Sequence, residues 1–235
     1  MISQLLFGEV YEIIEKTSAW YKILTEYDQY KGWIDSKMFS PVSHDYYKRL
    51  EQGDYFVSGP ITSTIIGPDN TKLTITAGST LGNRPENGII KIDSFIFRLI
   101  DETFEPANSH SFGLINTAKR FLNSPYLWGG RTPFGLDCSG FTQIVYKING
   151  MRLPRDASQQ ATIGESVNTQ PELGEGDLVF FCNEEDKVVH VGLALPPDKI
   201  IHCSGMVRID SLDEKGIFNT QLNQYTHRLH SMRRI

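Results

Sequence analysis

Over residues 1–105, hydrophobic and polar positions alternate in short runs that are separated by turn-forming residues. Residues 72–76 (Lys-Leu-Thr-Ile-Thr) alternate with a period of two, which is typical of a strand with one buried face. Turn sequences rich in Gly, Pro and Asn precede two of these runs, at residues 67–70 and 85–88. The strand candidates are residues 20–24, 32–35, 72–76 and 89–92. We expect this region to form a small β-barrel.

The pattern changes near Glu105 and Pro106. Hydrophobic residues recur at helical spacing between 114 and 122, a second helix is predicted from Cys138 to a cap at Gly150, and a third covers residues 158–163. Strand patterns follow at residues 178–181, 188–195, 200–203 and 229–233. Helices followed by an antiparallel sheet are typical of an α+β domain. We therefore predict two domains, a barrel over residues 1–105 and an α+β domain over residues 106–235.

The composition of the 235 residues limits the choice of partners and location. The formal net charge is −5 and no run of Lys and Arg occurs, which argues against a nucleic acid or an anionic membrane and favours a small substrate. The chain begins without basic residues and has only a short apolar cluster at residues 5–7. This start predicts neither a signal peptide nor a membrane-spanning helix, so we expect a soluble, cytoplasmic protein.

The cysteines do not form a recognisable framework. Cys138, Cys182 and Cys203 are odd in number and irregular in spacing, which excludes a complete set of disulfides and a zinc ribbon. Motifs for zinc hydrolases, dinucleotides and nucleotide phosphates do not occur. We expect no metal and no cofactor, and at least one free thiol.

Cys138 is the strongest candidate for a nucleophile. It opens the second predicted helix, where unpaired N–H groups and the positive end of the helix dipole favour a thiolate and can also hold an oxyanion. Gly129, Gly130 and Gly135 precede it and allow a substrate to approach closely. The alternative is a buried structural cysteine, which is how we interpret Cys182 and Cys203.

His190 is the candidate base for this thiol. In the apolar strand 188–195 it shares a face with Gly192 and Ala194, whose small side chains leave room around the imidazole. His202 can orient that ring if the two strands pair in the right register, because a one-residue slip would separate the imidazoles. The alternative for His190 is a hydrogen-bonded core histidine. The remaining histidines are expected on the surface or in linkers: His44, His110, His227 and His230.

Five ordered blocks of sequence resemble the NlpC-type papain-like cysteine peptidases, which cut bacterial cell-wall peptides. The blocks are residues 126–130 (YLWGG), 137–141 (DCSGF), 155–160 (RDASQQ), 176–181 (GDLVFF) and 190–192 (HVG). The strand-rich region before them is similar to the γ-D-glutamyl-L-diamino acid endopeptidase branch of the family. In that branch a bacterial SH3-like β-barrel precedes the papain-like domain.

The resemblance implies a role for each residue of the catalytic group. Cys138 would be the nucleophile, His190 the base and His202 the orienting residue. Tyr126 would lie beside the sulfur and donate to the oxyanion, whereas its alternative role is packing at the helix end.

The resemblance also implies the substrate, a short peptide L-Ala-γ-D-Glu-diamino acid with a free amino terminus that a monomeric enzyme cuts during murein peptide recycling. The ammonium group needs carboxylate partners. The candidate substrate-binding residues are Glu9, Tyr30, Asp137, Ser139, Asp156 and Ser158. The alternatives are a helix cap for Asp137, a local hydrogen bond at the helix start for Ser139, and ordinary surface or turn positions for Glu9, Tyr30 and Asp156. Ala157 stands where some relatives carry a hydroxyl, so either Ala157 or Ser158 occupies that position.

Two other functions fit parts of the sequence. A papain-like domain with the same residues can act as an amidase or acyltransferase. A cell-wall binding module that has lost activity is the alternative from another class, and the presence of Cys138, His190 and His202 argues against it.

Overall fold

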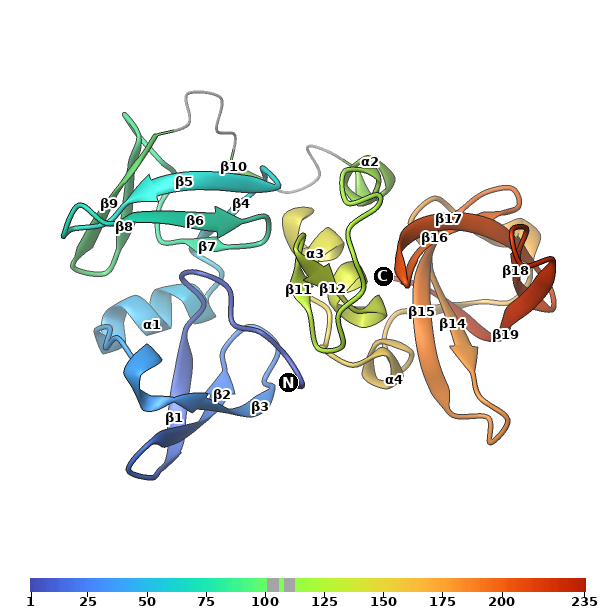
Figure 1. Ribbon diagram of the computed structural model, residues 1–235, viewed down its shortest axis with the longest axis horizontal. Coiled ribbons are helices and arrows are strands. Elements are labelled where there is room, and N and C mark those ends of the chain that lie inside the picture. Colours follow the sequence, from blue (N-terminus) through green and yellow to red (C-terminus); the bar gives the residue numbers. More distant parts are fainter. Residues whose placement is uncertain (101–105, 108–112) are drawn as a thin grey trace. The chain divides into compact units, whose positions relative to one another are not determined.

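The computed structural model describes residues 1–100, 106–107 and 113–235 (Figure 1). The chain divides into two compact units. The N-terminal unit comprises residues 2–111 and 147–152, and the C-terminal unit comprises residues 112–146 and 153–235 together with Met1. The predicted boundary at Glu105 falls outside the described residues, as does His110.

The described residues of the N-terminal unit form three antiparallel sheets. The first is a meander, and the other two have the strand orders β6-β5-β9-β8 and β10-β4-β7. The strands of the first sheet are β1 (Tyr11–Lys16), β2 (Trp20–Thr25) and β3 (Lys31–Asp35). The others are β4 (Phe56–Ser58), β5 (Thr62–Ile66), β6 (Lys72–Thr76), β7 (Thr80–Leu81), β8 (Ile89–Ile92), β9 (Phe95–Leu99) and β10 (Pro106–Ala107). All four strands predicted in this region are confirmed.

A helix that the sequence analysis did not predict follows β3 and precedes β4 in the sequence. The short 3₁₀ helix η1 (Ser36–Met38) is followed by α1 (His44–Glu51), which begins at an N-cap where the Ser43 side chain accepts from the backbone N–H of Tyr46. Tyr46 and Leu50 are buried in one cluster with strand residues such as Ile65 and Ile90. Helix α1 thus supplies two residues, four positions apart, to the core of this unit.

The helices of the C-terminal unit are α2 (Leu114–Lys119), α3 (Cys138–Ile148) and α4 (Ala157–Gln160). The first two begin where the sequence predicts, and α4 begins one residue earlier. Helix α2 ends before the predicted residue 122, and Asn123 then adopts a left-handed conformation with φ of 69°. Gly150 has φ of 79°, as a C-terminal cap requires. Within the described part of the chain, no helix has the length and hydropathy needed to cross a membrane.

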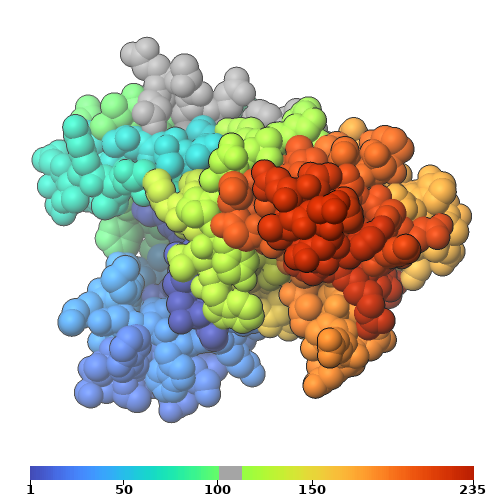
Figure 2. Space-filling view, turned by 45° about the vertical axis from the view of Figure 1, so that its right-hand side comes forward, coloured from blue at the N-terminus to red at the C-terminus, as the bar shows by residue number. Residues whose placement is uncertain are grey.

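Six strands of the C-terminal unit close into a barrel, which the sequence analysis did not predict. The strand order is β13-β19-β14-β15-β16-β17-β18, and an additional pairing of β18 with β19 closes the ring from β14 to β19. The strands are β13 (Glu165–Val167), β14 (Leu178–Cys182), β15 (Val188–Leu195), β16 (Lys199–Ser204), β17 (Met206–Asp213), β18 (Gly216–Asn219) and β19 (Gln224–Arg234). A 3₁₀ helix, η2 (Gln170–Glu172), precedes β14. The last strands of the barrel are drawn in orange to red in Figure 2.

The barrel has a buried apolar cluster of its own, and helices lie beside it. Val179, Phe181, Ala194 and Ile200 belong to a buried cluster that β14, β15 and β16 share with the later strands. Helix α4 packs against β15. Helix α3 is buried along its apolar residues, Phe141, Ile144, Val145 and Ile148. The predicted α+β architecture is confirmed, with the added feature that its sheet is a closed barrel.

Gly192 provides a test of the β15–β16 contact. A Cβ atom at Gly192 would lie 2.8 Å from Cβ of His202 and 2.8 Å from Cδ1 of Ile200. We expect Gly192→Ala to reduce the free energy of unfolding by about 1–3 kcal/mol, because a packed core must shift to accept the methyl group. Thermal unfolding measures the loss. Gly32→Ala is the control, since an added Cβ there meets nothing within 4 Å. Equal melting temperatures for the wild type and Gly192→Ala would contradict the expectation.

Candidate active site

A buried carboxylate fixes the start of helix α3. Asp137 Oδ1 accepts from the backbone N–H of Gly140 at 2.7 Å, and Oδ2 accepts from that of Gly129 at 2.8 Å. Arg155 donates to both oxygens at 3.1 and 2.6 Å and to Oγ of Ser139 at 3.0 Å. Asp137 is therefore a helix cap and the counter-ion of a buried arginine. In this structure both Asp137 and Ser139 are engaged at the helix start, and their predicted contact with substrate stays a prediction.

Cys138 is the first residue of α3 and is 9% exposed. Burial raises the pKa of its thiol to about 11, and the charge of Asp137 adds to this, although hydrogen bonds from the backbone of Val191 and Ser139 act in the opposite direction. At neutral pH this shift favours the protonated thiol. The sequence analysis expected the helix start to favour a thiolate, but the loss of hydration outweighs that effect here.

The register of β15 and β16 brings two imidazoles together. Gly192 pairs with His202, so His190, two residues earlier, lies on the same face as a diagonal neighbour of His202. Nε2 of His190 lies 2.8 Å from Nδ1 of His202. The register that the sequence left open is thus the one that joins the two rings. Burial lowers the pKa of His190 well below 6.5, and the nearby His202 and His227 lower it further.

Asp210 extends this pair and was not identified from the sequence. Nε2 of His202 lies 2.9 Å from Oδ2 of Asp210, and Arg208 donates from Nη2 to Oδ1 at 2.9 Å. The Arg208 Nε atom is also 2.7 Å from Oδ2 as part of the ion pair. Burial would raise the pKa of Asp210, but the bonds from His202 and Arg208 outweigh it and the pKa lies below the usual 3.8. The signal in the sequence was the alternation of Arg208 and Asp210 in a strand after His202.

His227 is partly buried and its ring lies against that of the catalytic candidate His190, a contact that the expectation of a surface or linker residue did not include. The two rings are stacked, with centroids 4.1 Å apart and an angle of 28° between planes. Phe181 packs near both rings, at 5.8 Å from His190 and 6.0 Å from His227. His44 and His230 are exposed, as expected. His227 reaches His190 because β19 closes the barrel.

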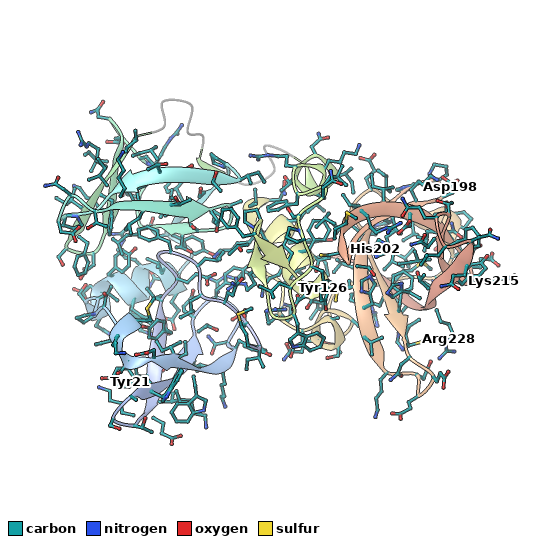
Figure 3. The ribbon with its side chains drawn as sticks, in the orientation of Figure 1. Tyr21, Tyr126, Asp198, His202, Lys215 and Arg228 are labelled. Atoms are coloured by element: carbon teal, nitrogen blue, oxygen red, sulfur yellow. The ribbon has the colours of Figure 1, made fainter. Side chains whose placement is uncertain are left out.

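Tyr126 lies in the segment before α3, and its backbone N–H donates to Gly205 O at 2.9 Å in the β16–β17 turn. Burial raises the pKa of Tyr126 to about 12, and the charges of Cys138 and Asp137 add to the effect. The phenol therefore remains a hydrogen-bond donor at neutral pH. Figure 3 labels Tyr126, which precedes Cys138 in the sequence, and His202, which follows it.

Helix α4 carries two further substrate-binding candidates. Asp156 is its N-cap residue, and its backbone N–H donates to Oε1 of Gln159 at 3.2 Å. Ala157 is buried whereas Ser158 is exposed, so the hydroxyl of Ser158 faces away from the core. Gln160 holds the helix on α3 by donating to Ser139 O at 3.1 Å.

Glu9 and Tyr30 belong to the N-terminal unit. Glu9 forms a buried ion pair with Lys147, with Oε1 2.7 Å from Nζ, and accepts from the backbone N–H of Leu6 at 2.9 Å. The backbone N–H of Tyr30 donates to Oγ1 of Thr25 at 2.8 Å. The predicted contacts of Glu9 and Tyr30 with the substrate remain predictions.

The histidine cluster does not have the arrangement of a metal site. Among the residues that the structure describes, no group of three or more His, Cys, Asp or Glu side chains can hold a metal ion. The rings of His190 and His227 are stacked face to face, which directs their nitrogens away from a common centre.

Two family models match the chain. The model of the NlpC/P60 family matches residues 123–226, and the model described as the bacterial dipeptidyl-peptidase Sh3 domain matches residues 1–38. The first covers Tyr126, Cys138, His190, His202 and Asp210. The second lies within the strand-rich region for which an SH3-like domain was expected.

Two curated relatives and one crystal structure are similar over most of the chain. The γ-D-glutamyl-L-lysine dipeptidyl-peptidase of Bacillus cereus is 30% identical over 85% of this chain and 66% of the relative. The enzyme of the same name from Bacillus subtilis is 30% identical over 85% of this chain and 71% of the relative. The crystal structure of an NlpC/P60 family protein from Bacillus cereus has a TM-score of 0.80 and 25% identity, covering 99% of this chain and 81% of that one. The chain thus spans about two thirds of the curated relatives' length.

The position of His227 predicts a pH effect on stability. Burial lowers its pKa from 6.5 to about 4, with a further contribution from His202, so the unfolded chain binds the proton more tightly. Stability is therefore lost as the pH falls from about 6.5 toward 4. We expect the drop in melting temperature between about pH 7 and pH 5 to be smaller in His227→Phe, which keeps an aromatic ring but cannot titrate. His230→Phe, an exposed site on the same strand, is the control, and equal drops in all three proteins would contradict the expectation.

Proposed function

The chain belongs to the NlpC/P60 family of cysteine peptidases, and we propose that it hydrolyses the bond between γ-D-glutamate and a diamino acid in short cell-wall peptides. The peptide would carry a free N-terminal L-alanine. The observation that carries the proposal is the hydrogen bond between His190 and His202, in a unit whose helix α3 begins at Cys138. The names of the two Bacillus relatives support the choice of bond.

In the proposed mechanism, the reaction starts from a neutral thiol and a neutral imidazole. Because burial keeps the proton on Cys138, His190 acts as a general base and accepts it through Nδ1, the ring nitrogen that does not face His202. The sulfur then attacks the γ-carbonyl carbon of D-glutamate, and the carbonyl oxygen becomes an oxyanion.

Stabilisation of that oxyanion is assigned to donors near the start of α3. The proposed donors are backbone N–H groups of the first helical turn other than that of Gly140, which Asp137 occupies, and the protonated phenol of Tyr126. Collapse of the intermediate breaks the C–N bond, and His190 gives its proton to the departing amine. Water, deprotonated by the same imidazole, then attacks the thioester, which releases L-Ala-γ-D-Glu and restores the thiol.

Recognition of the free amine distinguishes a dipeptidyl-peptidase from an enzyme that cuts intact cell wall. We assign the ammonium group to the carboxylates of Asp156 and Glu9, with Tyr30, Asp137, Ser139 and Ser158 as further contacts. An ammonium ion removed from water needs such charged partners. An enzyme with this requirement acts on released peptides, so we place it in murein peptide recycling and expect it to work as a monomer.

The proposed reaction predicts the behaviour of a Cys138→Ala variant. The wild type is expected to release L-Ala-γ-D-Glu from L-Ala-γ-D-Glu-L-Lys or its diaminopimelate analogue, and Cys138→Ala is expected to lose this activity by at least about 10³-fold because no nucleophile remains. Mass spectrometry of the products provides the measurement, and Cys182→Ala is the matched control. Addition of an amine acceptor distinguishes hydrolysis from acyl transfer. A wild type that leaves both peptides intact would contradict the proposal.

The role of Glu9 predicts selectivity for free amines. We expect Glu9→Gln to lower kcat/KM by about 10- to 100-fold for the free-amine peptide, because a charge-assisted hydrogen bond is lost, and to leave the slower cleavage of the N-acetylated peptide unchanged. Glu15→Gln, at an exposed position of β1, is the control. Equal losses for both peptides would indicate that Glu9 only pairs with Lys147.

A further inference from the structure

A continuous chain of hydrogen bonds crosses three strands of the barrel. The pairings Gly192 to His202 and His202 to Arg208 make His190, His202 and Asp210 successive diagonal neighbours on one face. The contacts are 2.8 Å between the imidazoles and 2.9 Å from His202 to Asp210. All three residues are at least nine-tenths buried, so these contacts are shielded from water.

Asp210, at the end of this series of hydrogen bonds, determines which ring nitrogen of each histidine carries the proton. An ionised carboxylate only accepts hydrogen bonds, so the contact with Asp210 requires a proton on Nε2 of His202. When His202 is neutral, its Nδ1 then carries no proton and must accept. Nε2 of His190 is therefore the donor of the 2.8 Å contact, which leaves Nδ1 of a neutral His190 without a proton.

We propose that Asp210 is a positioning residue that sets the tautomers of His202 and His190, so that Nδ1 of His190 is ready to accept the proton of Cys138. The inference rests on the proposed function and adds Asp210 to the residues named there. Asp210 does not touch the reacting atoms. It acts through two successive imidazoles. Without its carboxylate, no acceptor would favour a proton on Nε2 of His202 over one on Nδ1.

Arg208 stabilises the ionised form of the Asp210 carboxylate, in which it accepts the hydrogen bond from His202. Its Nη2 donates to Oδ1, and its Nε lies 2.7 Å from Oδ2, so the guanidinium compensates for burial of the charge. Asp210 therefore remains an acceptor at neutral pH. His227 offers no competing partner to the chain, because it meets the face of the His190 ring rather than its nitrogens.

The same arrangement assists proton transfer during the reaction. When Nδ1 of His190 takes the proton from the sulfur, the ring becomes a cation that still donates from Nε2 to His202. Nε2 of His202 still donates to Asp210, so the negative charge of this carboxylate stabilises the imidazolium of His190. No proton has to leave either of the two hydrogen bonds.

Nitrogen NMR of the free protein tests the tautomers directly. In protein labelled with ¹⁵N-histidine, we expect both His190 and His202 to show a protonated Nε2 and an unprotonated Nδ1 at a pH where the rings are neutral. Signals are assigned with His190→Gln and His202→Gln. A wild-type His190 that carries its proton on Nδ1 would overturn the proposal without any Asp210 variant, and without reference to a substrate.

Asp210→Asn tests the source of the tautomers. In this variant the amide oxygen of Asn accepts from Arg208, so its NH₂ group faces Nε2 of His202 and donates to it. The proton of His202 would then move to Nδ1. His190 would in turn accept at Nε2 and carry its own proton on Nδ1. We expect this exchange in the NMR spectrum, together with a fall in kcat on the order of 10²- to 10⁴-fold and little change in KM.

Two controls separate positioning from stability. Asp213→Asn makes the same chemical change on the same strand, where the carboxylate contacts Tyr225 and a turn, and should keep the wild-type tautomers and kcat. Arg208→Gln weakens the support of the carboxylate without removing it, so it should change the tautomers less and lose less kcat than Asp210→Asn.

The outcomes distinguish this proposal from the proposed function. A folded Asp210→Asn with wild-type tautomers or wild-type kcat would overturn the role of Asp210. If the wild type shows the expected tautomers and their exchange but cuts no cell-wall peptide, the positioning role stands and the proposed substrate fails. If Asp210→Asn does not fold, the wild-type tautomers decide.

Discussion

The pairing of β15 with β16 is the constraint on which the site depends. Gly192 opposite His202 places two imidazoles on one face at hydrogen-bonding distance, and it has no side chain because a Cβ atom would collide with His202. A shift by one residue would turn His202 to the other side of the sheet. Closure of the barrel by β18 and β19 resists such a shift, since every strand from β14 to β19 is paired on both sides.

The second constraint is the buried pair of Asp137 and Arg155, which joins the segments on either side of Cys138. Two backbone N–H groups and one guanidinium share the carboxylate, so the first turn of α3 cannot move without breaking several bonds at once. The same carboxylate places a negative charge beside the sulfur, which contributes to the high pKa of Cys138. Rigidity of the helix start and acidity of the thiol are therefore opposed in this site.

Much of the fold and part of the site could be predicted from sequence because their signals are local. The alternation of residues 188–195, the helix beginning at Cys138 and the cap at Gly150 were confirmed, and so was the family resemblance of the five blocks. Helix α1 was missed because it spans only His44–Glu51 and buries two side chains, too few for a clear period.

Asp210 and His227 were missed for another reason: their roles arise from pairing between strands that are distant in the chain. Asp210 reaches the site by the register of β17 on β16, and His227 by the closure of β19 on β18. The alternation of Arg208 and Asp210 marks only a strand, and His227 has no neighbour in sequence that marks it. The site thus combines residues that short sequence patterns identify with residues that approach the site only once the barrel has formed.

The protonated state of the sulfur has a consequence for how the molecule survives oxidising conditions. Peroxides attack the anionic form of cysteine, and a buried thiol with a pKa near 11 offers very little of it at neutral pH. Damage to Cys138 by sulfenic acid formation should therefore be slow as long as the thiol keeps its proton.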